Sequence, residues 1–365
     1  MYSHLLVSLA SLISKPTGIS NYTLNLLPHL KALDPTVLAA QPLNGYRYYP
    51  IAANQTSEAG IGGRLRRLYW TQLQLPNLYQ DLRATLLFSP LPEAPIFTPC
   101  RYIVMAHDLI PLRFPKGWSP RTLYFRHWVP HVFQQAQHII CNSIATANDL
   151  HHFFHIPTTK ITPIPLAYDD RHFTPQPAPS PSELSLPYFL YIGHHEPYKN
   201  LSRLISAFAL VVNSQHDTAC QLWLAGPTDN RYTPQLKAQV NALGIDRHVQ
   251  FLDYAPYAQL PDLLRGAVAL VFPSLWEGFG IPVLEAMACG TPVITSNLAA
   301  MPEVAGEAAI LVDPYNIQAI AAAMRDVLND RQLRQHLQQA GLRRAQQFRW
   351  SLTGQHTVDL LRRYL

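Results

Sequence analysis

A glycine-rich loop and two glutamates mark the segment LWEGFGIPVLEAMACGTPVI, residues 275–294. An apolar run precedes the loop, and a helix is predicted from about Ile281 to Cys289. Glycines let backbone N–H groups approach a ligand, and a helix N-terminus adds unpaired donors and a partial positive charge. Glu277 in the loop and Glu285 on the helix can both accept hydroxyl groups of one bound molecule. The segment therefore predicts a site for a phosphorylated sugar; the alternative is a plain strand-loop-helix with two solvated glutamates.

A second candidate site lies in the first half of the chain, where VMAHDLIP places His107 and Asp108 directly after an apolar run. A His-Asp pair can act as a base and its orienting partner, so alone it would indicate hydrolysis or proton transfer. The alternatives are a core histidine whose hydrogen bonds are satisfied, and an aspartate that caps a turn.

Other candidate residues also follow apolar runs. In YIGHHEPYKNL, Lys199 can supply a point charge to a phosphate, or it is an exposed surface charge. Gly18 follows the first apolar run and opens a helix. Asn142 and Ser143 close the strand HIICNS, where polar groups that line a cleft belong, although Ser143 also suits capping of the next helix.

The elements that must position these residues alternate along the chain between short apolar runs and amphipathic stretches. Strand, helix, strand, helix predicts parallel sheets with helices on both faces, which is the α/β class. In such sheets ligands bind outside the carboxyl ends of the strands. The loops that carry the candidate residues therefore lie where chemistry is expected.

The chain is long enough for two domains, because 365 residues exceed what one hydrophobic core usually supports. Five prolines in TPQPAPSPSELSLP predict an extended linker at residues 174–187. We expect one domain at 1–173, a second at 188–345, and a C-terminal helix at 346–365 that crosses back to the first domain.

Composition excludes several classes. With 48% hydrophobic and 14% charged residues the chain folds, and a net charge of +5 without a Lys/Arg run does not indicate nucleic-acid binding. Four separated cysteines predict neither a zinc site nor a disulfide framework. The apolar start LLVSLASLI reads as a buried strand, not a signal peptide, and no stretch is long enough for a membrane helix.

Two further patterns have structural and functional interpretations. GRLRRLYWTQLQLPNLYQDL (residues 62–82) combines Arg64, Arg66 and Arg67 with aromatic and apolar residues. Such a helix can rest on an anionic membrane or guide a lipid-linked acceptor, or it is an ordinary surface helix. HHFFH (residues 151–155) puts two histidines four apart, a spacing compatible with a metal, although no Cys or carboxylate accompanies them.

The glutamate pair with G-F-G-x-P between its members resembles the signature of glycosyltransferase family 4. SPLPEAPIF, VMAHDLIPLRFP, YIGHHEPYKNLSRLISAF, LWLAGP and MPEVAGEAAILVDP are also similar to this family, in its bacterial mannosyltransferase-like branch. The resemblance extends over nearly the whole chain. It implies the GT-B architecture, two Rossmann-like domains that face a cleft. The chain has no D-x-D, which argues against the metal-dependent glycosyltransferase architecture.

The resemblance implies a role for each motif residue. Glu285 would bind the ribose hydroxyls and Glu277 the donor sugar, and Lys199 would stabilise the departing diphosphate. His107 would contact the donor sugar near its reacting carbon and so act in catalysis with Lys199 and Glu277. The other implied donor contacts are the backbone around Gly278, Phe279, Gly280 and Ile281, together with Gly18, Asn142, Ser143, His194 and Glu303. Glu303 would shape the nucleotide pocket, or it caps a helix start.

The chain departs from this pattern at two positions. Many relatives carry Arg where Tyr198 stands, and some carry a phosphate-binding Arg where His194 stands. A protonated His194 is one expected substitute for the missing cation. The second positive contact to the diphosphate is therefore undefined by the sequence.

The implied reaction is retaining transfer of a hexose from a nucleoside diphosphate sugar to a glycan or lipid-linked acceptor. A GDP-sugar such as GDP-mannose or GDP-fucose is favoured over a UDP-sugar, with no required cofactor or metal. The implied location is the cytoplasm, including the inner face of the plasma membrane. A nucleotide-sugar epimerase or hydrolase and a catalytically silent paralogue that binds nucleotide sugar are the alternatives.

Overall fold

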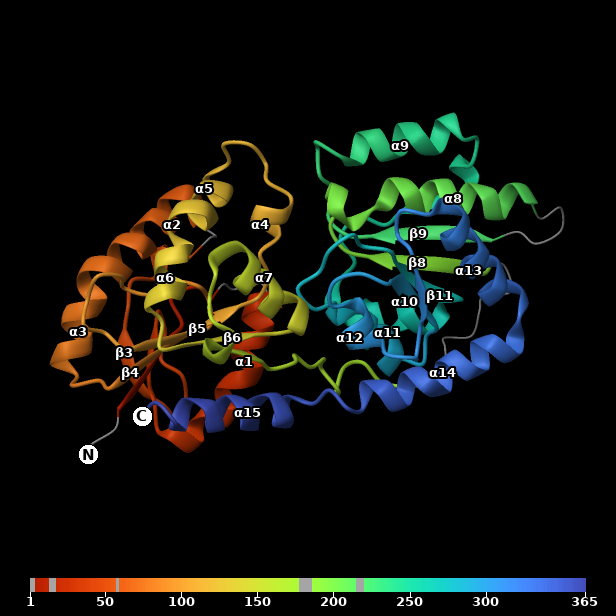
Figure 1. Ribbon diagram of the computed structural model, residues 1–365. Coiled ribbons are helices and arrows are strands. Elements are labelled where there is room, and N and C mark those ends of the chain that lie inside the picture. Colours follow the sequence, from red (N-terminus) through yellow and green to blue (C-terminus); the bar gives the residue numbers. More distant parts are fainter. Residues whose placement is uncertain (1–3, 13–17, 57–58, 177–185, 215–219) are drawn as a thin grey trace. The chain divides into compact units, whose positions relative to one another are not determined.

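The computed structural model describes residues 4–12, 18–56, 59–176, 186–214 and 220–365. The chain divides into two compact units (Figure 1). Unit 1 contains Met1–Leu166 and Trp350–Leu365, and unit 2 contains Ala167–Arg349. Each unit is an α/β layer structure and is described by itself.

Unit 1 contains a seven-stranded sheet in the order β3-β2-β1-β4-β5-β6-β7. All of its neighbouring strands pair in parallel. Strands β1, β2, β4, β5 and β6 are buried along most or all of their length, because helices cover both faces of a parallel sheet. The strands are β1 (Leu5–Ser8), β2 (Thr36–Ala39), β3 (Arg47–Pro50), β4 (Leu86–Ser89), β5 (Tyr102–Ala106), β6 (His138–Cys141) and β7 (Ile161–Pro163).

The helices of unit 1 connect these strands and bury apolar faces on them, and fully buried residues such as Leu87, Val104 and Ile139 form the core. The main helices are α1 (Gly18–Leu30), α2 (Gly60–Tyr69), the π-helix η4 (Trp70–Gln74), α3 (Leu75–Asp81), α4 (Ile110–Arg113), α5 (Pro120–His127), α6 (Val129–Gln135), α7 (Ile144–Phe154) and α15 (Trp350–Arg362). Short 3-10 turns are η1 (Lys31–Leu33), η2 (Ala53–Gln55) and η5 (Thr158–Lys160).

Unit 2 contains a six-stranded sheet, again parallel throughout, in the order β10-β9-β8-β11-β12-β13. Its strands are β8 (Tyr188–Ile192), β9 (Gln221–Ala225), β10 (Val249–Phe251), β11 (Ala269–Phe272), β12 (Val293–Ser296) and β13 (Ile310–Val312). The order reverses between β8 and β11. Loops that leave the carboxyl ends of these two strands therefore flank a topological switch point, where α/β proteins bind ligands.

The helices of unit 2 form two layers. Figure 1 shows α8 and α9 on one side of β8 and β9, where α13 packs against α8, and α14 packs against α11. The helices are α8 (Leu201–Ser214), α9 (Thr233–Ala242), α10 (Leu260–Gly266), α11 (Ile281–Ala288), α12 (Met301–Ala305), α13 (Ile317–Asn329) and α14 (Arg331–Ala345). The 3-10 turns are η6 (Pro197–Lys199), η7 (Asp246–His248) and η8 (Tyr257–Gln259).

The predicted fold class is confirmed: the chain has two Rossmann-like parallel-sheet units, and its C-terminal helix α15 belongs to unit 1. The geometric boundary comes earlier than residue 173, because unit 2 begins at Ala167. His172 stacks on Tyr257 with ring centroids 4.1 Å apart, and Arg265 donates to the carbonyl of Thr174, so this segment packs with unit 2. Residues 177–185 of the predicted linker lie outside the described residues.

Helix α15 packs against α1 at Gly354. A Cβ atom at this position would lie 2.2 Å from Cγ of His29, so only glycine permits the close approach. Thr353, on the same helix α15, donates its hydroxyl to the backbone carbonyl of Pro165 at 2.8 Å.

Replacing Gly354 with leucine should therefore lower the free energy of unfolding by about 3 kcal/mol, because overpacking exceeds the roughly 1 kcal/mol gained in helix propensity. Urea denaturation measures this loss. His356→Ala, at an exposed position of α15, should change stability by less than about 0.5 kcal/mol. Equal stability of the leucine variant and the wild-type chain would contradict the close packing.

None of the helices among the described residues combines the length and apolar character needed to cross a membrane.

Candidate functional site

The loop after β11 and the start of α11 have the backbone that the sequence predicts. Gly280 has φ +105°, a left-handed conformation that favours glycine, and a Cβ there would lie 2.4 Å from Cε of Met301. Pro282 lies in the first turn of α11, and Gly290 follows its end with φ +75°. The helix thus begins at the carboxyl edge of the sheet with its backbone donors at the loop.

Lys199 and Glu277 meet at this edge, although 78 residues separate them in the chain. Nζ of Lys199 donates to Oε1 of Glu277 at 2.6 Å, and the side chains are only 12% and 10% exposed. The ammonium also lies 5.2 Å from the ring centroid of Tyr198 and 5.3 Å from that of Phe272. The largely buried ammonium of Lys199 therefore lies beside the carboxylate of Glu277 at the topological switch point of the sheet.

Asn200 holds the turn that carries Lys199, and sequence analysis missed it. Its φ is +64°, and its Nδ2 donates to the carbonyls of Pro273 at 3.0 Å and Pro314 at 2.7 Å. The backbone N–H of Leu275 donates to the carbonyl of Tyr198 at 2.7 Å and ties the two loops together. Asn is enriched at left-handed backbone positions, so the Asn directly after Lys199 in the sequence could have indicated the end of a tight turn here.

His194 follows β8 at the same edge, in surroundings that disfavour a positive charge on its ring. The side chain is solvent-exposed, but desolvation and then the positive charge of Lys199 lower its pKa, against the opposing effect of the carboxylates of Glu196, Asp229 and Glu277. A lowered pKa favours the neutral imidazole and so opposes the expected protonation of His194, whose contact with the diphosphate stays a prediction.

Arg231 is a second cation at this edge, on the loop that follows β9. Its Nε and Nη2 donate to the two carboxylate oxygens of Asp229 at 2.9 and 2.5 Å. Nη2 also lies 4.0 Å from Oε1 of Glu196, which precedes the turn of Lys199. The side chain is 59% exposed, so it can exchange partners. No family motif contains it, which is why sequence analysis missed it.

Glu285 lies on α11 among other titratable groups. Burial, and then the charge of Asp169, raise its pKa to about 8. Tyr257 donates to Oδ2 of Asp169 at 3.3 Å, and burial raises the pKa of this phenol so that it stays protonated. Asp169 and Tyr257 were not candidates in the sequence, because they stand 116 and 28 positions from Glu285.

Glu303 lies in the first turn of α12, where a negative charge is favourable, but the N-cap of this helix is Ala300 and has no side-chain cap hydrogen bond. The backbone carbonyl of Glu303 accepts Nη2 of Arg344 at 2.5 Å. Its role in a nucleotide pocket stays a prediction.

The candidates of unit 1 form a separate group. His107 Nε2 donates to the carbonyl of Pro90 at 2.9 Å, its pKa is lowered mainly by burial, and the ring contacts Tyr22 of α1 edge to face. Asn142 Nδ2 donates to the carbonyl of His107 at 2.8 Å. Ser143 accepts the backbone N–H of Thr146 and caps α7, which agrees with the capping interpretation.

Gly18 begins α1 and is exposed, and a Cβ atom at this position would meet no other atom within 4 Å among the described residues. Asp108 Oδ1 accepts the backbone N–H of Ile110, so it caps a turn. The expected role of His107 toward a donor sugar stays a prediction.

His151 and His155, the two histidines four apart in HHFFH, do not share a helix. Helix α7 ends at Phe154, and His155 takes a left-handed conformation with φ +53° as its C-cap, while Nδ1 of His151 bonds the carbonyl of Ile156. Within the described parts of the chain, three or more His, Cys, Asp or Glu residues nowhere gather in a way that could hold a metal ion.

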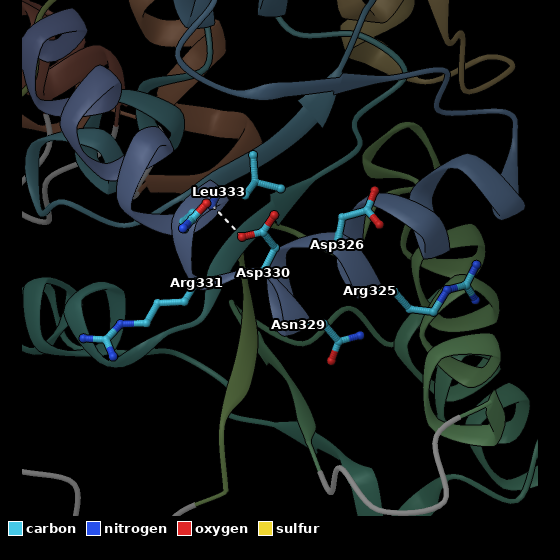
Figure 2. A pocket seen from close by; sticks show the side chains of 7 residues that line it. Arg325, Asp326, Asn329, Asp330, Arg331 and Leu333 are labelled. Atoms are coloured by element: carbon cyan, nitrogen blue, oxygen red, sulfur yellow. Dashed lines mark hydrogen bonds between the residues drawn. The ribbon is translucent and has the colours of Figure 1, made fainter.

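A cavity of about 600 Å³ in unit 2 lies elsewhere, between the end of α13 and the start of α14 (Figure 2). Helix α13 follows β13 and runs back, so this cavity lies toward the amino ends of the strands. Asp330 caps α14 by accepting the N–H of Leu333, and Arg325 and Arg331 point in different directions (Figure 2). The polar side chains that converge on one another are not in this cavity. They lie around Lys199, at the opposite end of the sheet.

The fold of the chain matches solved glycosyltransferase structures. Sucrose-phosphate synthase from Thermosynechococcus elongatus aligns with a TM-score of 0.77 at 18% identity, over 99% of each chain. Anabaena HepE in complex with UDP-glucose aligns with a TM-score of 0.72 at 17% identity, over 99% of each chain. These likenesses define a glycosyltransferase architecture of the GT-B class.

Sequence comparisons give the family. Residues 16–172 match the model described as Glycosyltransferase Family 4, and residues 173–344 match Glycosyl transferases group 1. O-antigen chain mannosyltransferase B of Escherichia coli is 30% identical over 71% of this chain and 69% of that protein. O-antigen chain mannosyltransferase RfbU of Salmonella typhimurium is 25% identical over 88% of this chain and 90% of that protein. The chain belongs to glycosyltransferase family 4 and is a hexosyltransferase.

Proposed function

We propose that the chain transfers a hexose from a GDP-sugar, with GDP-mannose favoured and GDP-fucose as another candidate, to an acceptor hydroxyl with retention of anomeric configuration. The acceptor is a glycan or lipid-linked glycan in polysaccharide, glycolipid or glycoconjugate synthesis in the cytoplasm. The observation that carries this proposal is the confined Lys199–Glu277 pair at the switch point of unit 2.

The mechanism uses charge and positioning. Lys199 and the amides at the start of α11 stabilise the diphosphate as its bond to the anomeric carbon breaks. Glu277 accepts sugar hydroxyls and orients the ring. The acceptor oxygen bonds to the anomeric carbon from the side of the leaving group, and the diphosphate takes the acceptor proton. We propose that no covalent nucleophile, metal or cofactor is needed.

The two O-antigen relatives support mannose by their names, whereas the Anabaena structure holds UDP-glucose. A thermal-shift panel with GDP, UDP, ADP and the corresponding nucleotide sugars identifies the nucleotide base of the donor, because a ligand that binds only the native state raises Tm. We expect GDP and GDP-mannose to give the largest shifts. A larger shift with UDP-glucose would overturn the GDP assignment.

Incubation with donor alone tests the alternative activities. A transferase should release free sugar slowly and form no epimer, and it should consume the donor rapidly only when an acceptor is added. Rapid hydrolysis or epimer formation without acceptor would favour the epimerase or hydrolase alternative.

We propose that Arg231 supplies the second positive contact to the diphosphate. Arg231→Ala should lower kcat/KM for the donor by roughly tenfold, about 1.4 kcal/mol, because one exposed cation is lost while Lys199 remains. Steady-state kinetics with the identified donor measure this effect.

Two variants control the Arg231 test. Arg331→Ala removes an arginine of the same unit at the opposite end of the sheet (Figure 2) and should leave kcat/KM unchanged. His194→Arg in the Arg231→Ala background should restore most of the lost activity by returning an arginine to the position that relatives use. Wild-type kinetics in Arg231→Ala would rule out this role.

A further inference from the structure

A row of large apolar side chains is exposed along α2 and η4 of unit 1. This apolar row consists of Ile61, Leu65, Tyr69 and Leu73, whose exposed fractions are 68%, 61%, 59% and 56%. The regular spacing of four residues places successive members on one side of a helix. Soluble surfaces carry single exposed apolar residues routinely, but a continuous row indicates an interaction site.

The opposite side of the same helices is anchored in unit 1. Arg67 donates Nε and Nη2 to the two carboxylate oxygens of Glu93 at 2.6 and 2.8 Å, and Nη1 to the carbonyl of Gln55 at 3.0 Å. Trp70 of η4 is 6% exposed, and Leu75, the first residue of the following helix α3, is 1% exposed in the core. The segment therefore already has a buried face, and the apolar row is an additional face that the described residues of unit 1 do not cover.

Positive charge surrounds the apolar row. Residues 60–74 contain three arginines and no Asp or Glu, and Arg64 and Arg66 are exposed beside Leu65. Unit 1 as a whole contains 15 Lys and Arg against 7 Asp and Glu, a formal charge of +8, whereas unit 2 contains 13 against 16, a charge of −3. The net charge of the chain thus comes from the unit that exposes the row.

We propose that the apolar row is a docking face for an anionic lipid bilayer. Apolar side chains on one helical face, flanked by arginines, fit the boundary between acyl chains and anionic headgroups. A second copy of the chain is disfavoured as the occupant, because a two-fold contact through this face would bring Arg64 and Arg66 against their own equivalents. This proposal does not depend on which donor the chain uses.

Vesicle flotation of the full chain tests the proposal. We expect binding to phosphatidylcholine vesicles that contain about 30 mol% phosphatidylglycerol, and at least about tenfold weaker binding to phosphatidylcholine alone. Binding should also weaken at about 0.5 M salt, because salt screens the arginines. Equal binding to both vesicles, or binding to neither, would overturn the proposal.

Two paired variants separate the apolar and electrostatic contributions. Leu65→Ser with Leu73→Ser, and Arg64→Ser with Arg66→Ser, should each lower vesicle binding at least about tenfold, without changing the thermal shift given by nucleotide. Leu352→Ser, at a residue 48% exposed on α15 of the same unit, is the matched control and should bind as the wild-type chain does.

Analytical ultracentrifugation without vesicles tests the other occupant. A concentration-dependent dimer that the Leu65→Ser, Leu73→Ser variant abolishes would assign the row to a second copy and overturn the lipid proposal. A monomer that floats only with anionic vesicles supports it. Neither readout requires donor or acceptor, so failure of the proposed transfer reaction would be seen separately.

Discussion

Replacing Lys199 with alanine should lower kcat by roughly 10²- to 10³-fold. The ammonium is 12% exposed, so its charge is poorly screened, and it lies at the carboxyl edge where the diphosphate is expected to leave. Donor affinity should fall less than kcat does, because the charge that needs stabilisation grows as the bond to the sugar breaks. Single-turnover and steady-state kinetics with the identified donor separate these effects.

The same substitution should also lower stability. Glu277 would lose its partner at 2.6 Å while remaining buried, and breaking such a pair costs about 3 kcal/mol. The double variant Lys199→Ala, Glu277→Ala removes both charges and should recover most of the lost stability, but it should remain inactive. Recovery of stability without recovery of activity distinguishes a role in the reaction from a structural role.

Arg331→Ala is the matched control for charge removal within unit 2, and it should retain wild-type activity and stability. A Lys199→Ala variant that keeps more than about a tenth of the wild-type kcat would contradict the assignment, because loss of an electrostatic contact to the leaving group costs more than this.

Nucleotide binding should strengthen as pH rises from 7 through about 8, and it should level off near pH 9. The pKa of Glu285 is about 8, raised by burial and then by the charge of Asp169. We propose that this carboxylate accepts the ribose hydroxyls, which donate best to its ionised form. Affinity should change by up to about tenfold over one pH unit, the limit for one proton. Calorimetric titration with GDP between pH 7 and 9 measures this, since phosphate groups with a pKa near 6 are already ionised there.

Two variants identify the titrating group. Glu285→Gln should bind GDP roughly tenfold more weakly than the wild-type chain at pH 9 and show no pH dependence in this window. Asp169→Asn removes the repelling charge, so the midpoint of the wild-type transition should move below pH 8. An unchanged pH dependence in Glu285→Gln would exclude Glu285 as its source.

Stability should change with pH in the opposite sense. The unfolded chain loses the Glu285 proton near the ordinary pKa of 4.5, whereas the folded chain holds it until about pH 8. The unfolded state therefore binds fewer protons between these values, and the free energy of unfolding falls as pH rises. Glu285→Gln should gain roughly 1 to 3 kcal/mol relative to the wild-type chain between pH 5 and 8.

Local sequence patterns predicted secondary structure correctly where the residues that specify an element lie within a few positions of it. The helix predicted from about Ile281 to Cys289 is α11, Ile281–Ala288, because Gly280, Pro282 and Gly290 specify its start and end. The alternation of apolar runs and helices predicted the two parallel sheets, since both faces of such sheets must be apolar. The spacing in HHFFH does not put His151 and His155 on one helical face, because the helix ends at Phe154, before His155.

Groups from separate loops required the tertiary structure. The resemblance of separate motifs predicted Lys199 and Glu277 as site residues one by one. Only the fold shows that Nζ of Lys199 lies 2.6 Å from Oε1 of Glu277. Arg231 belongs to no motif, and its position near Glu196 follows from the neighbouring strands β8 and β9. The environment of Glu285 likewise depends on Asp169, which is remote in sequence.

The amino-acid sequence by itself determined the α/β class, the family, the order of the elements and the loop that opens α11, because periodicity, glycine and proline act over short distances along the chain. Tertiary structure alone decided which charges meet, that the pKa of His194 is lowered and that of Glu285 raised to about 8, and that the described residues of unit 1 leave one face of α2 uncovered. Coulomb interactions and desolvation depend on distance and burial in space, which sequence separation does not specify.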